Sequence, residues 1–204
     1  MKRAALHNLG CKVNAYELDI MQQNLQEKGY TIVPFDEMAD IYIVNTCTVT
    51  NIADRKSRQM LHQAKKRNPE AVVVAVGCYV QTADEEALRE QGIDLAIGNN
   101  RKKDLIPILE KFLAEHKQEE DAIIDVNAPC DYEEMTLKHT AEHTRAYIKI
   151  QDGCNQFCSL HHSLCQRKGA QQTLRGHPPG NGRAGAERLQ GSGADRHPHQ
   201  LLRH

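Results

Sequence analysis

Three mostly apolar runs in the first half of the chain each end at a cysteine, and a helical pattern follows each cysteine. The runs and their cysteines are residues 4–9 with Cys11, residues 40–46 with Cys47, and residues 71–77 with Cys78. Short continuous apolar runs are typical of strands that are buried on both faces of a parallel sheet. We therefore expect three such strands, each with its cysteine at the point where the strand gives way to a loop.

The pattern up to residue 127 alternates between helical and extended periodicity. We expect helices at about 13–28, 51–66, 83–91 and 104–116, and additional strands at 30–33 and 93–97. Strands that alternate with helices predict right-handed crossovers and a doubly wound parallel sheet. Residues 1–127 are therefore assigned to an α/β domain.

Polar residues mark where two of these helices begin. Thr82 and Glu85 have the spacing of a capping box, in which Thr82 is the N-cap. Asp104 is expected to cap the last helix, with Pro107 accommodated in its first turn. Both expectations concern local hydrogen bonds from a side chain to the backbone.

The pattern changes twice after residue 127. Residues 128–144 combine proline, acidic residues and histidine without periodicity, so we interpret them as a linker. Residues 145–151 again alternate between apolar and polar side chains and predict the first strand of a second domain. We assign residues 145–159 to the start of that domain. Residues 160–204 contain no Ile, Val, Met, Phe or Tyr, and they carry seven basic residues against two acidic ones. A segment with so little to bury cannot offset the entropy of ordering, so we expect it to be disordered.

Composition adds little about partners but indicates a compartment. The formal net charge is −1, so bulk charge indicates no particular partner. No apolar run approaches the roughly 20 residues that a membrane helix needs, and the N-terminus lacks the apolar core of a signal peptide. We therefore expect a cytoplasmic protein with no membrane contact. In that reducing compartment the seven cysteines are better explained as ligands or thiols than as disulfides.

Two sets of cysteines are candidates for binding a metal. Cys11, Cys47 and Cys78 would meet at the carboxyl ends of their strands, which form the ligand crevice of an open α/β sheet. Cys154 and Cys158 lie at the end of the strand predicted for the second domain, and thiolates on a short loop suit an iron–sulfur cluster. The alternatives are that the first three are small buried apolar residues and that the other two are exposed thiols.

Four short motifs around these cysteines occur together over residues 1–159. They are Leu-Gly-Cys-Lys-Val-Asn at 9–14, Asn-Thr-Cys at 45–47, Gly-Cys at 77–78, and Gln-Asp-Gly-Cys-Asn-Gln-Phe-Cys at 151–158. With them the chain resembles the radical-SAM methylthiotransferases that modify tRNA. The run at residues 46–58 is similar to the branch that acts on threonylcarbamoyladenosine beside the anticodon, and it differs from the branch that acts on isopentenyladenosine. Together with the repeated strand ends, this resemblance favours the ligand interpretation.

The resemblance implies an enzyme that adds a methylthio group to carbon two of the adenine. One SAM would be the methyl donor and another the source of a radical. Cys11, Cys47 and Cys78 would hold an auxiliary [4Fe–4S] cluster with one iron open for the transferred sulfur. Cys154 and Cys158 would belong to a second [4Fe–4S] cluster that binds SAM. The expected partners are therefore tRNA and SAM, and we expect a monomer.

The second cluster lacks one ligand. The family's loop requires a cysteine three residues after Cys158, where this chain has His161. Codons can be chosen for residues 160–168 so that a start one base later reads Cys-Ile-Ile-Pro-Tyr-Ala-Arg-Gly, which is similar to the family's sequence from its third cysteine. A frameshift after Ser159 thus accounts for both the missing ligand and the unusual composition of residues 160–204. Cys165 would then be an accident of the new frame.

These observations predict the N-terminal cluster domain of such an enzyme, followed by the first strand of a truncated radical-SAM barrel, without activity of its own. The alternative is a non-catalytic iron–sulfur-binding fragment. Cys130, in the predicted linker, is interpreted as a bystander. The basic runs at 65–67 and 101–103 could contact tRNA phosphates, but both lie near helix ends, where solvated charge is the commoner explanation. Within residues 1–127, the region of the predicted sheet, neither a G-x-G-x-x-G motif nor a P-loop is present, which disfavours a nucleotide-binding sheet.

Overall fold

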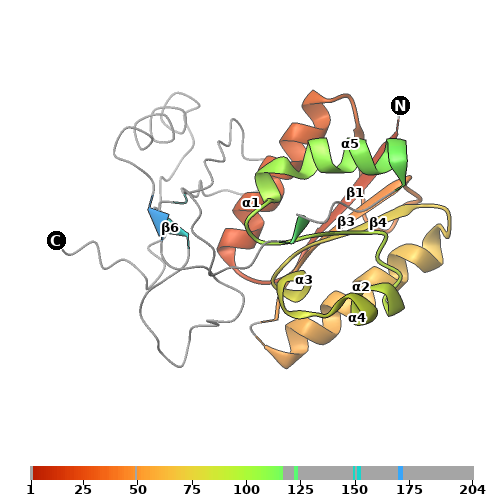
Figure 1. Cartoon of the computed structure of the whole chain (residues 1–204). Coiled ribbons are helices and arrows are strands. Elements are labelled where there is room, and N and C mark those ends of the chain that lie inside the picture. The colour runs from red at the N-terminus through yellow and green to blue at the C-terminus, as the bar shows by residue number, and fades with distance from the viewer. Residues whose placement is uncertain are drawn as a thin grey trace.

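The structure, a computed structural model, describes residues 2–48, 50–116, 122–123, 149, 151–152 and 170–171. Its main feature is a five-stranded parallel sheet with the order β2-β1-β3-β4-β5. The strands are β1 (Arg3–Asn8), β2 (Thr31–Val33), β3 (Ile41–Thr46), β4 (Val72–Gly77) and β5 (Leu95–Ile97). The chain winds outward from β1 to β2 and then returns to β3, so the order reverses between β1 and β3. The predicted α/β class with a doubly wound parallel sheet is confirmed (Figure 1).

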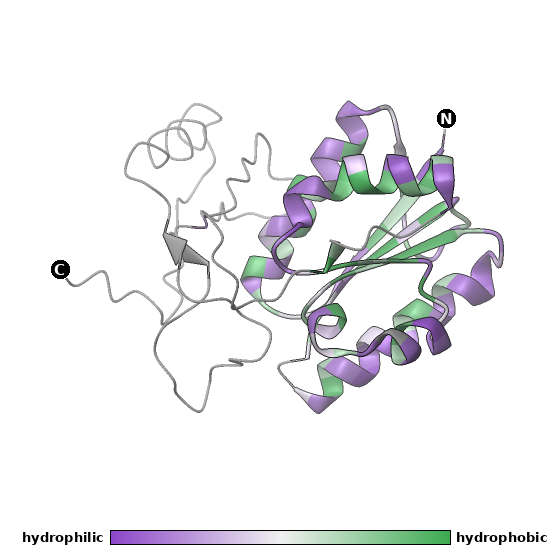
Figure 2. Ribbon diagram, in the orientation of Figure 1, coloured by the Kyte–Doolittle hydropathy of each residue, from purple (hydrophilic) through white to green (hydrophobic). Residues whose placement is uncertain are grey.

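Helices cover both faces of this sheet. On one face lie α1 (Lys12–Glu27) and α5 (Leu105–Glu115), and on the other lie α2 (Asn51–Arg67), α3 (Cys78–Thr82) and α4 (Glu85–Glu90) (Figure 1). A short 3-10 helix, η1 (Lys102–Asp104), leads directly into α5. The apolar residues of the helices face the sheet and their polar residues face outward (Figure 2).

Successive strand residues belong to opposite apolar layers. On β3, Ile41 and Ile43 pack with α1 and α5, whereas Tyr42 and Val44 pack with the helices of the other face. All four residues have no exposed surface. Because both faces of the strand are covered, its first four positions are all apolar, and this is why the sequence shows a continuous run rather than an alternation.

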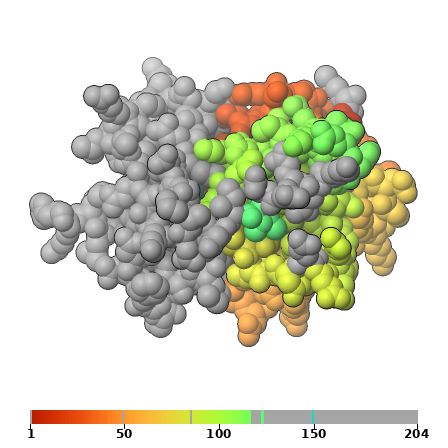
Figure 3. Space-filling model, in the orientation of Figure 1, coloured from red at the N-terminus to blue at the C-terminus, as the bar shows by residue number. Residues whose placement is uncertain are grey.

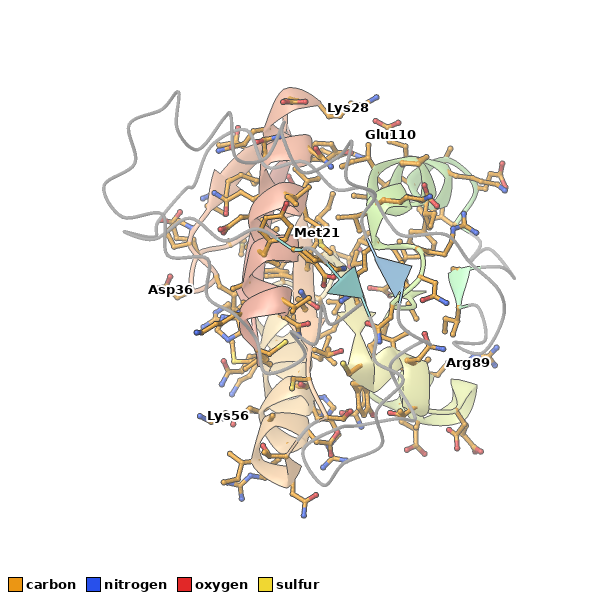
Figure 4. All side chains as sticks on the ribbon, turned by 90° about the vertical axis from the view of Figure 1, so that its left-hand side faces the viewer. Met21, Lys28, Asp36, Lys56, Arg89 and Glu110 are labelled. Carbon is orange, nitrogen blue, oxygen red and sulfur yellow. The ribbon has the colours of Figure 1, made fainter. Side chains whose placement is uncertain are left out.

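The helices α1 and α5 lie side by side over their layer (Figure 3). Met21 of α1 is 1% exposed and points into the layer, while Lys28 and Glu110 meet at the outer end of the pair (Figure 4). The Nζ atom of Lys28 is 3.8 Å from Oε1 of Glu110, and both side chains are about half exposed. An exposed ion pair of this kind contributes little, so apolar burial is what holds these helices to the sheet.

Two predicted helix starts differ from the structure. Thr82 ends α3, and its hydroxyl lies 3.2 Å from the carbonyl oxygens of Cys78 and Tyr79, so Thr82 is not an N-cap. The N-cap of α4 is Asp84, whose Oδ1 accepts from the amide of Ala87 at 2.8 Å. The capping-box prediction was wrong because the extra turn α3, which starts directly at Cys78, takes up the Thr82 hydroxyl.

Asp104 occupies the N-cap position of α5 as predicted, but it makes no capping hydrogen bond. Its Oδ2 instead accepts from Nε of Arg101 at 2.8 Å. The preceding 3-10 turn η1 places Asp104 inside a helical segment, so its carboxylate is directed back toward Arg101. Pro107 lies in the first turn of α5, as expected.

Several predictions fall outside the described residues. These are the linker at 128–144, the second-domain segment at 145–159 apart from residues 149 and 151–152, and the tail at 160–204 apart from residues 170–171. Here the structure describes Lys149 and an antiparallel pair of two-residue strands, β6 (Gln151–Asp152) with β7 (Ala170–Gln171). None of the helices described is both long and apolar enough to cross a membrane.

Candidate functional site

The sheet topology brings Cys11, Cys47 and Cys78 to one edge. Their strands, β1, β3 and β4, are adjacent in the sheet and all point the same way. Cys11 is the N-cap residue of α1 after β1, Cys47 directly follows β3, and Cys78 is the first residue of α3 directly after β4. Within the described residues none of the three forms a disulfide, and Cys47 and Cys78 are only 3% and 7% exposed. The structure therefore places the three residues together at the carboxyl edge of the sheet.

Two glycines let the backbone pass close to these cysteines. Gly10 has φ of +116°, and a Cβ atom there would lie 2.7 Å from both Cβ and Sγ of Cys47. Gly77 has φ of +99°, and a Cβ atom there would lie 2.7 Å from Oδ1 of Asn45. Only glycine adopts such dihedral angles without strain and offers this space. The Gly-Cys pairs in the sequence thus reflect backbone that must touch the neighbouring strand end.

Side-chain hydrogen bonds hold the strand ends in place. Nδ2 of Asn14, on α1, donates to the carbonyl of Thr46 at 3.0 Å, and Nδ2 of Asn45 donates to the carbonyl of Asn14 at 2.9 Å. The amide of Cys47 donates to Oγ of Ser57, on α2, at 3.2 Å. These bonds join β3 to helices on both faces of the sheet. The cysteines are therefore carried on a preorganised frame.

A buried ionic cluster of Glu17, Lys102 and Lys149 lies beside this edge. Nζ of Lys102 is 2.5 Å from Oε2 of Glu17, Nζ of Lys149 is 2.7 Å from Oε1, and the three side chains are 2–3% exposed. Burial alone would lower the pKa of Lys102, but the Glu17 carboxylate and then the Cys78 thiolate raise it above the ordinary lysine value. Lys102 is therefore a buried cation, and the interpretation of the run 101–103 as solvated or phosphate-binding charge is wrong for this residue.

The second basic run, 65–67, also makes structural contacts. Nζ of Lys65 is 2.7 Å from Oδ2 of Asp94, and the guanidinium of Arg67 lies 5.5 Å from the centre of the Phe35 ring. Both residues belong to the last turn of α2, where cations also interact favourably with the helix dipole. These contacts explain the charges without a nucleic-acid partner.

The thiol of Cys11 is held in its neutral form by its surroundings. Burial is the main cause of its raised pKa, and the Glu17 carboxylate adds to it. The backbone amides of Asn14 and Val13 and the Lys102 cation act in the opposite direction without cancelling the effect. Because a metal binds the thiolate, binding at Cys11 must displace a proton.

Several buried polar atoms at this edge have no hydrogen-bond partner among the residues that the structure describes. They are Oδ1 of Asn8 at the end of β1, Oδ1 of Asn45 in β3, Oγ1 of Thr48 just after β3, and both amide atoms of Asn100 in the loop after β5. Buried polar groups are nearly always hydrogen-bonded, so each unpartnered atom requires an explanation. A ligand at the carboxyl edge of the sheet accounts for their concentration there.

The chemistry of this edge fits an iron–sulfur cluster. Three soft thiol ligands come from neighbouring strand ends, and a buried cation lies beside them. In the part of the chain that the structure describes, no three His, Cys, Asp or Glu side chains are close enough together to enclose a metal ion. The second predicted set, Cys154 and Cys158, lies outside the described residues, as do Cys130, His161 and Cys165.

Sequence comparison identifies relatives of this region. Residues 3–98, which include all three cysteines, match the model of Uncharacterized protein family UPF0004. The chain is 39% identical over 158 residues to the threonylcarbamoyladenosine tRNA methylthiotransferase MtaB of Aquifex aeolicus, and 38% identical over 160 residues to MtaB of Bacillus subtilis. It is 29% identical over 170 residues to the tRNA-2-methylthio-N(6)-dimethylallyladenosine synthase of Ehrlichia canis. These matches cover 78% of this chain and 38%, 35% and 37% of the respective relatives.

Among solved structures, the chain resembles the radical S-adenosylmethionine methyltransferase TsrM from Kitasatospora setae with cobalamin and a [4Fe–4S] cluster bound. The TM-score is 0.59 at 14% identity, over 92% of this chain and 46% of that one, so the likeness is one of fold. The chain thus spans little more than a third of the length of the curated relatives it matches. By its UPF0004 region and by its identity to the MtaB proteins, the chain belongs to the tRNA methylthiotransferase family.

Proposed function

We propose that this chain is the N-terminal, cluster-binding part of a tRNA methylthiotransferase whose substrate is threonylcarbamoyladenosine beside the anticodon. The observation that carries the proposal is the position of three cysteines, Cys11, Cys47 and Cys78, at the ends of adjacent strands within the matched region. Support for this substrate comes from identities of 30–39% to three MtaB proteins, against 27–29% to three dimethylallyladenosine synthases. A protein that modifies tRNA would act in the cytoplasm, and we propose that it does so as a monomer.

Cys11, Cys47 and Cys78 would hold a [4Fe–4S] cluster, which supplies the sulfur for the methylthio group. The contribution of the chain is to hold three thiolates on a rigid strand edge and to exclude water from them. Cys47 and Cys78 are buried, and the backbone of Gly10 covers the sulfur of Cys47. Lys102 would offset part of the negative charge that the thiolates acquire.

The rest of the chain is proposed to follow the organisation expected from the sequence. Residues 1–127 would form the cluster-binding domain, 128–144 the linker, and 145–159 the start of the radical-SAM domain. Cys154 and Cys158 would be two ligands of a second [4Fe–4S] cluster, at which SAM binds. Residues 160–204 would be an out-of-frame tail.

Iron and sulfide analysis tests the first cluster. We expect the protein, purified without oxygen and reconstituted with iron and sulfide, to bind one [4Fe–4S] cluster that is lost in the triple variant Cys11→Ala, Cys47→Ala, Cys78→Ala. The matched control is the double variant Cys130→Ala, Cys165→Ala, which removes thiols outside the predicted site and should retain the iron. Undiminished iron in the triple variant would contradict the assignment.

The 204-residue chain itself is proposed to be inactive on tRNA. A radical-SAM cluster needs three thiolates, and His161 stands where the third is expected. An anaerobic assay with SAM, reductant and threonylcarbamoylated tRNA should show neither reductive cleavage of SAM nor a methylthio product. The gene with its frame restored after Ser159 should give both. Turnover by the unaltered chain would refute the proposal of inactivity.

The alternative is a non-catalytic protein that binds iron and sulfur through the same three cysteines. His161 favours this alternative, because it removes a ligand from the catalytic cluster while leaving Cys11, Cys47 and Cys78 untouched. Resequencing the gene at codons 158–168 separates the two. A reading frame that continues into a barrel sequence one base later supports the enzyme, and its absence supports the binding protein.

A further inference from the structure

The loop after β5 and the first residue of η1, together residues 98–102, pack against the cysteine edge, and the function proposed so far uses only Lys102 among them. The amide of Asn99 donates to Oε1 of Gln81 on α3 at 3.1 Å, and the amide of Gly98 donates to the carbonyl of Ala122 at 2.8 Å. A Cβ atom at Gly98 would lie 2.8 Å from Oε1 of Gln81. The loop is therefore held tightly against α3, the helix that begins at Cys78.

One polar side chain of this loop contacts a cysteine, and two more are buried in the same segment. Nδ2 of Asn99 is 3.9 Å from Sγ of Cys78. Asn100 is 6% exposed, and among the described residues neither of its amide atoms has a hydrogen-bond partner. Lys102 is 3% exposed, its positive charge acts to lower the pKa of Cys11, and Cys78 in turn raises the pKa of Lys102. The loop thus presents N–H donors and a positive charge beside two of the three predicted ligands.

A purely structural role does not account for these residues. An amide buried without a partner destabilises the fold, and leucine, which has nearly the same size, would fill the position of Asn100 without that cost. Lys102 is likewise a costly partner for Glu17, since a buried ion pair gains little over apolar packing. A bound group that accepts hydrogen bonds and carries negative charge satisfies both residues.

We propose that Asn99, Asn100 and Lys102 form a donor wall, a set of N–H groups that faces the sulfur atoms of the cluster held by Cys11, Cys47 and Cys78 and raises its reduction potential. This role rests on the cluster proposed above. N–H groups that donate to thiolate or sulfide sulfur stabilise the reduced, more negative cluster, and a fixed cation does the same through its charge. The donor wall would therefore set how readily this cluster accepts an electron.

A redox titration of the reconstituted full-length chain tests the donor wall. Cys154 and Cys158 are replaced by alanine in the parent, so that the signal reports one cluster. Asn100→Leu removes a donor at nearly constant volume, Asn100→Asp replaces it with a charged acceptor, and Lys102→Met removes the cation. We expect the midpoint potential to shift to more negative values in all three variants, with a larger shift for Asn100→Asp than for Asn100→Leu.

Two control variants should keep the potential of the parent. Lys102→Arg retains the positive charge. Lys65→Met removes a lysine whose ion pair with Asp94 lies at the opposite, amino edge of the sheet. Because Lys102→Met leaves Glu17 with one lysine fewer, it can fail to fold, and the two Asn100 variants then decide the outcome.

Iron content, measured on every sample, separates the two proposals. A parent that binds no iron would overturn the proposed cluster site itself. A parent that binds iron, together with Asn100→Leu and Asn100→Asp variants that have the same iron content and the same midpoint potential, would overturn only the donor wall.

Discussion

At the scale of single residues, two glycines are as important to the site as the cysteines, because they leave space that a side chain would fill. Gly10 leaves room for the sulfur of Cys47, and Gly77 leaves room for the amide of Asn45. Both glycines also adopt positive φ angles that other residues avoid. The positions of the cysteines therefore depend partly on glycine backbone, which can approach the neighbouring strand end closely because glycine has no side chain.

Gly10→Ala should disturb the site more than its cost in backbone strain alone. The new Cβ atom would lie 2.7 Å from Sγ of Cys47, so that cysteine must move. We expect a loss of about 1–3 kcal/mol in the free energy of unfolding and a marked loss of reconstituted iron. Gly29→Ala is the matched control, because Gly29 has φ of +86° with nothing within 4 Å of the added atom. It should lose stability but retain iron, and equal iron loss in both variants would contradict this explanation.

Glu17 is the carboxylate that pairs with both Lys102 and Lys149, and its neutralisation should be costly. Glu17→Gln leaves the ammonium groups of Lys102 and Lys149 buried, so we expect a loss of about 3–5 kcal/mol in urea unfolding at neutral pH. The raised pKa of Lys102 means that its ion pair stabilises the fold fully below the ordinary lysine pKa and is lost only as pH rises through the folded value. Neutral pH therefore lies within the stabilised range.

The control for that measurement is Glu37→Gln. Glu37 pairs with Arg3 at 2.6 Å, but the two side chains are 52% and 43% exposed. Exposed pairs contribute about 0–1 kcal/mol, so this variant should unfold close to the parent. Similar losses for Glu17→Gln and Glu37→Gln would show that the Glu17 cluster is not buried in solution.

At the scale of elements, the five-residue helix α3 connects the strand edge to the rest of the site. The amide of Tyr79 donates to Oγ1 of Thr46 at 3.2 Å, so α3 starts on a hydrogen bond from the end of β3. Oγ1 of Thr46 in turn donates to the carbonyl of Val76 at 2.6 Å. One hydroxyl therefore ties together β3, β4 and the first turn that carries Cys78.

The correction at the start of α4 can be tested by two alanine variants. Asp84→Ala removes the hydrogen bond to the amide of Ala87, and we expect a loss of about 1 kcal/mol in thermal or urea unfolding. Thr82→Ala removes a hydroxyl that bonds only to carbonyls of its own helix and should cost less. The reverse order of the two losses would restore Thr82 as the cap.

At the scale of the whole molecule, Lys149 connects a distant part of the chain to the N-terminal domain. Its ammonium lies 2.7 Å from Glu17, and the two residues are separated by 132 positions in the sequence. This contact ties the side chain of Lys149, five positions before Cys154 in the sequence, to α1.

Limited proteolysis followed by mass spectrometry should reflect this anchoring. We expect residues 160–204 to be removed first, because their composition offers little to bury, and the remaining core to retain Lys149. In Glu17→Ala, which removes the partner of Lys149, cleavage should extend to earlier positions. A tail that resists protease while the chain is cut around Pro129 would contradict the expectation drawn from composition.

The apolar runs and the helical periodicity were enough to predict the parallel sheet and the edge at which the cysteines lie. β3 illustrates the reason, because burial on both faces favours apolar residues at the consecutive positions Ile41 to Val44 and leaves a signal in the sequence. The Gly-Cys pairs at residues 10–11 and 77–78 are a second example. In each pair the glycine makes the close backbone contact, and the candidate ligand is the next residue in the sequence. Local constraints of this kind are visible without a structure.

The electrostatic surroundings of the cysteines were decided by tertiary packing alone. Glu17 and Lys102 are 85 positions apart, and only the approach of α1 to η1 turns an apparently solvated lysine into a buried cation. Nothing in the sequence distinguished Asn100, because asparagine is common in solvent-exposed loops. It became unusual only when the structure showed that its amide is buried away from water. The wrong prediction of Thr82 as a cap has the same origin. The Thr82 hydroxyl and the Asp84 carboxylate are both suitable N-caps by sequence, and only the structure shows that the hydroxyl bonds within α3 instead. Burial and pairing between residues distant in the sequence depend on how the helices and strands pack together. Short stretches of sequence carry no information about that packing.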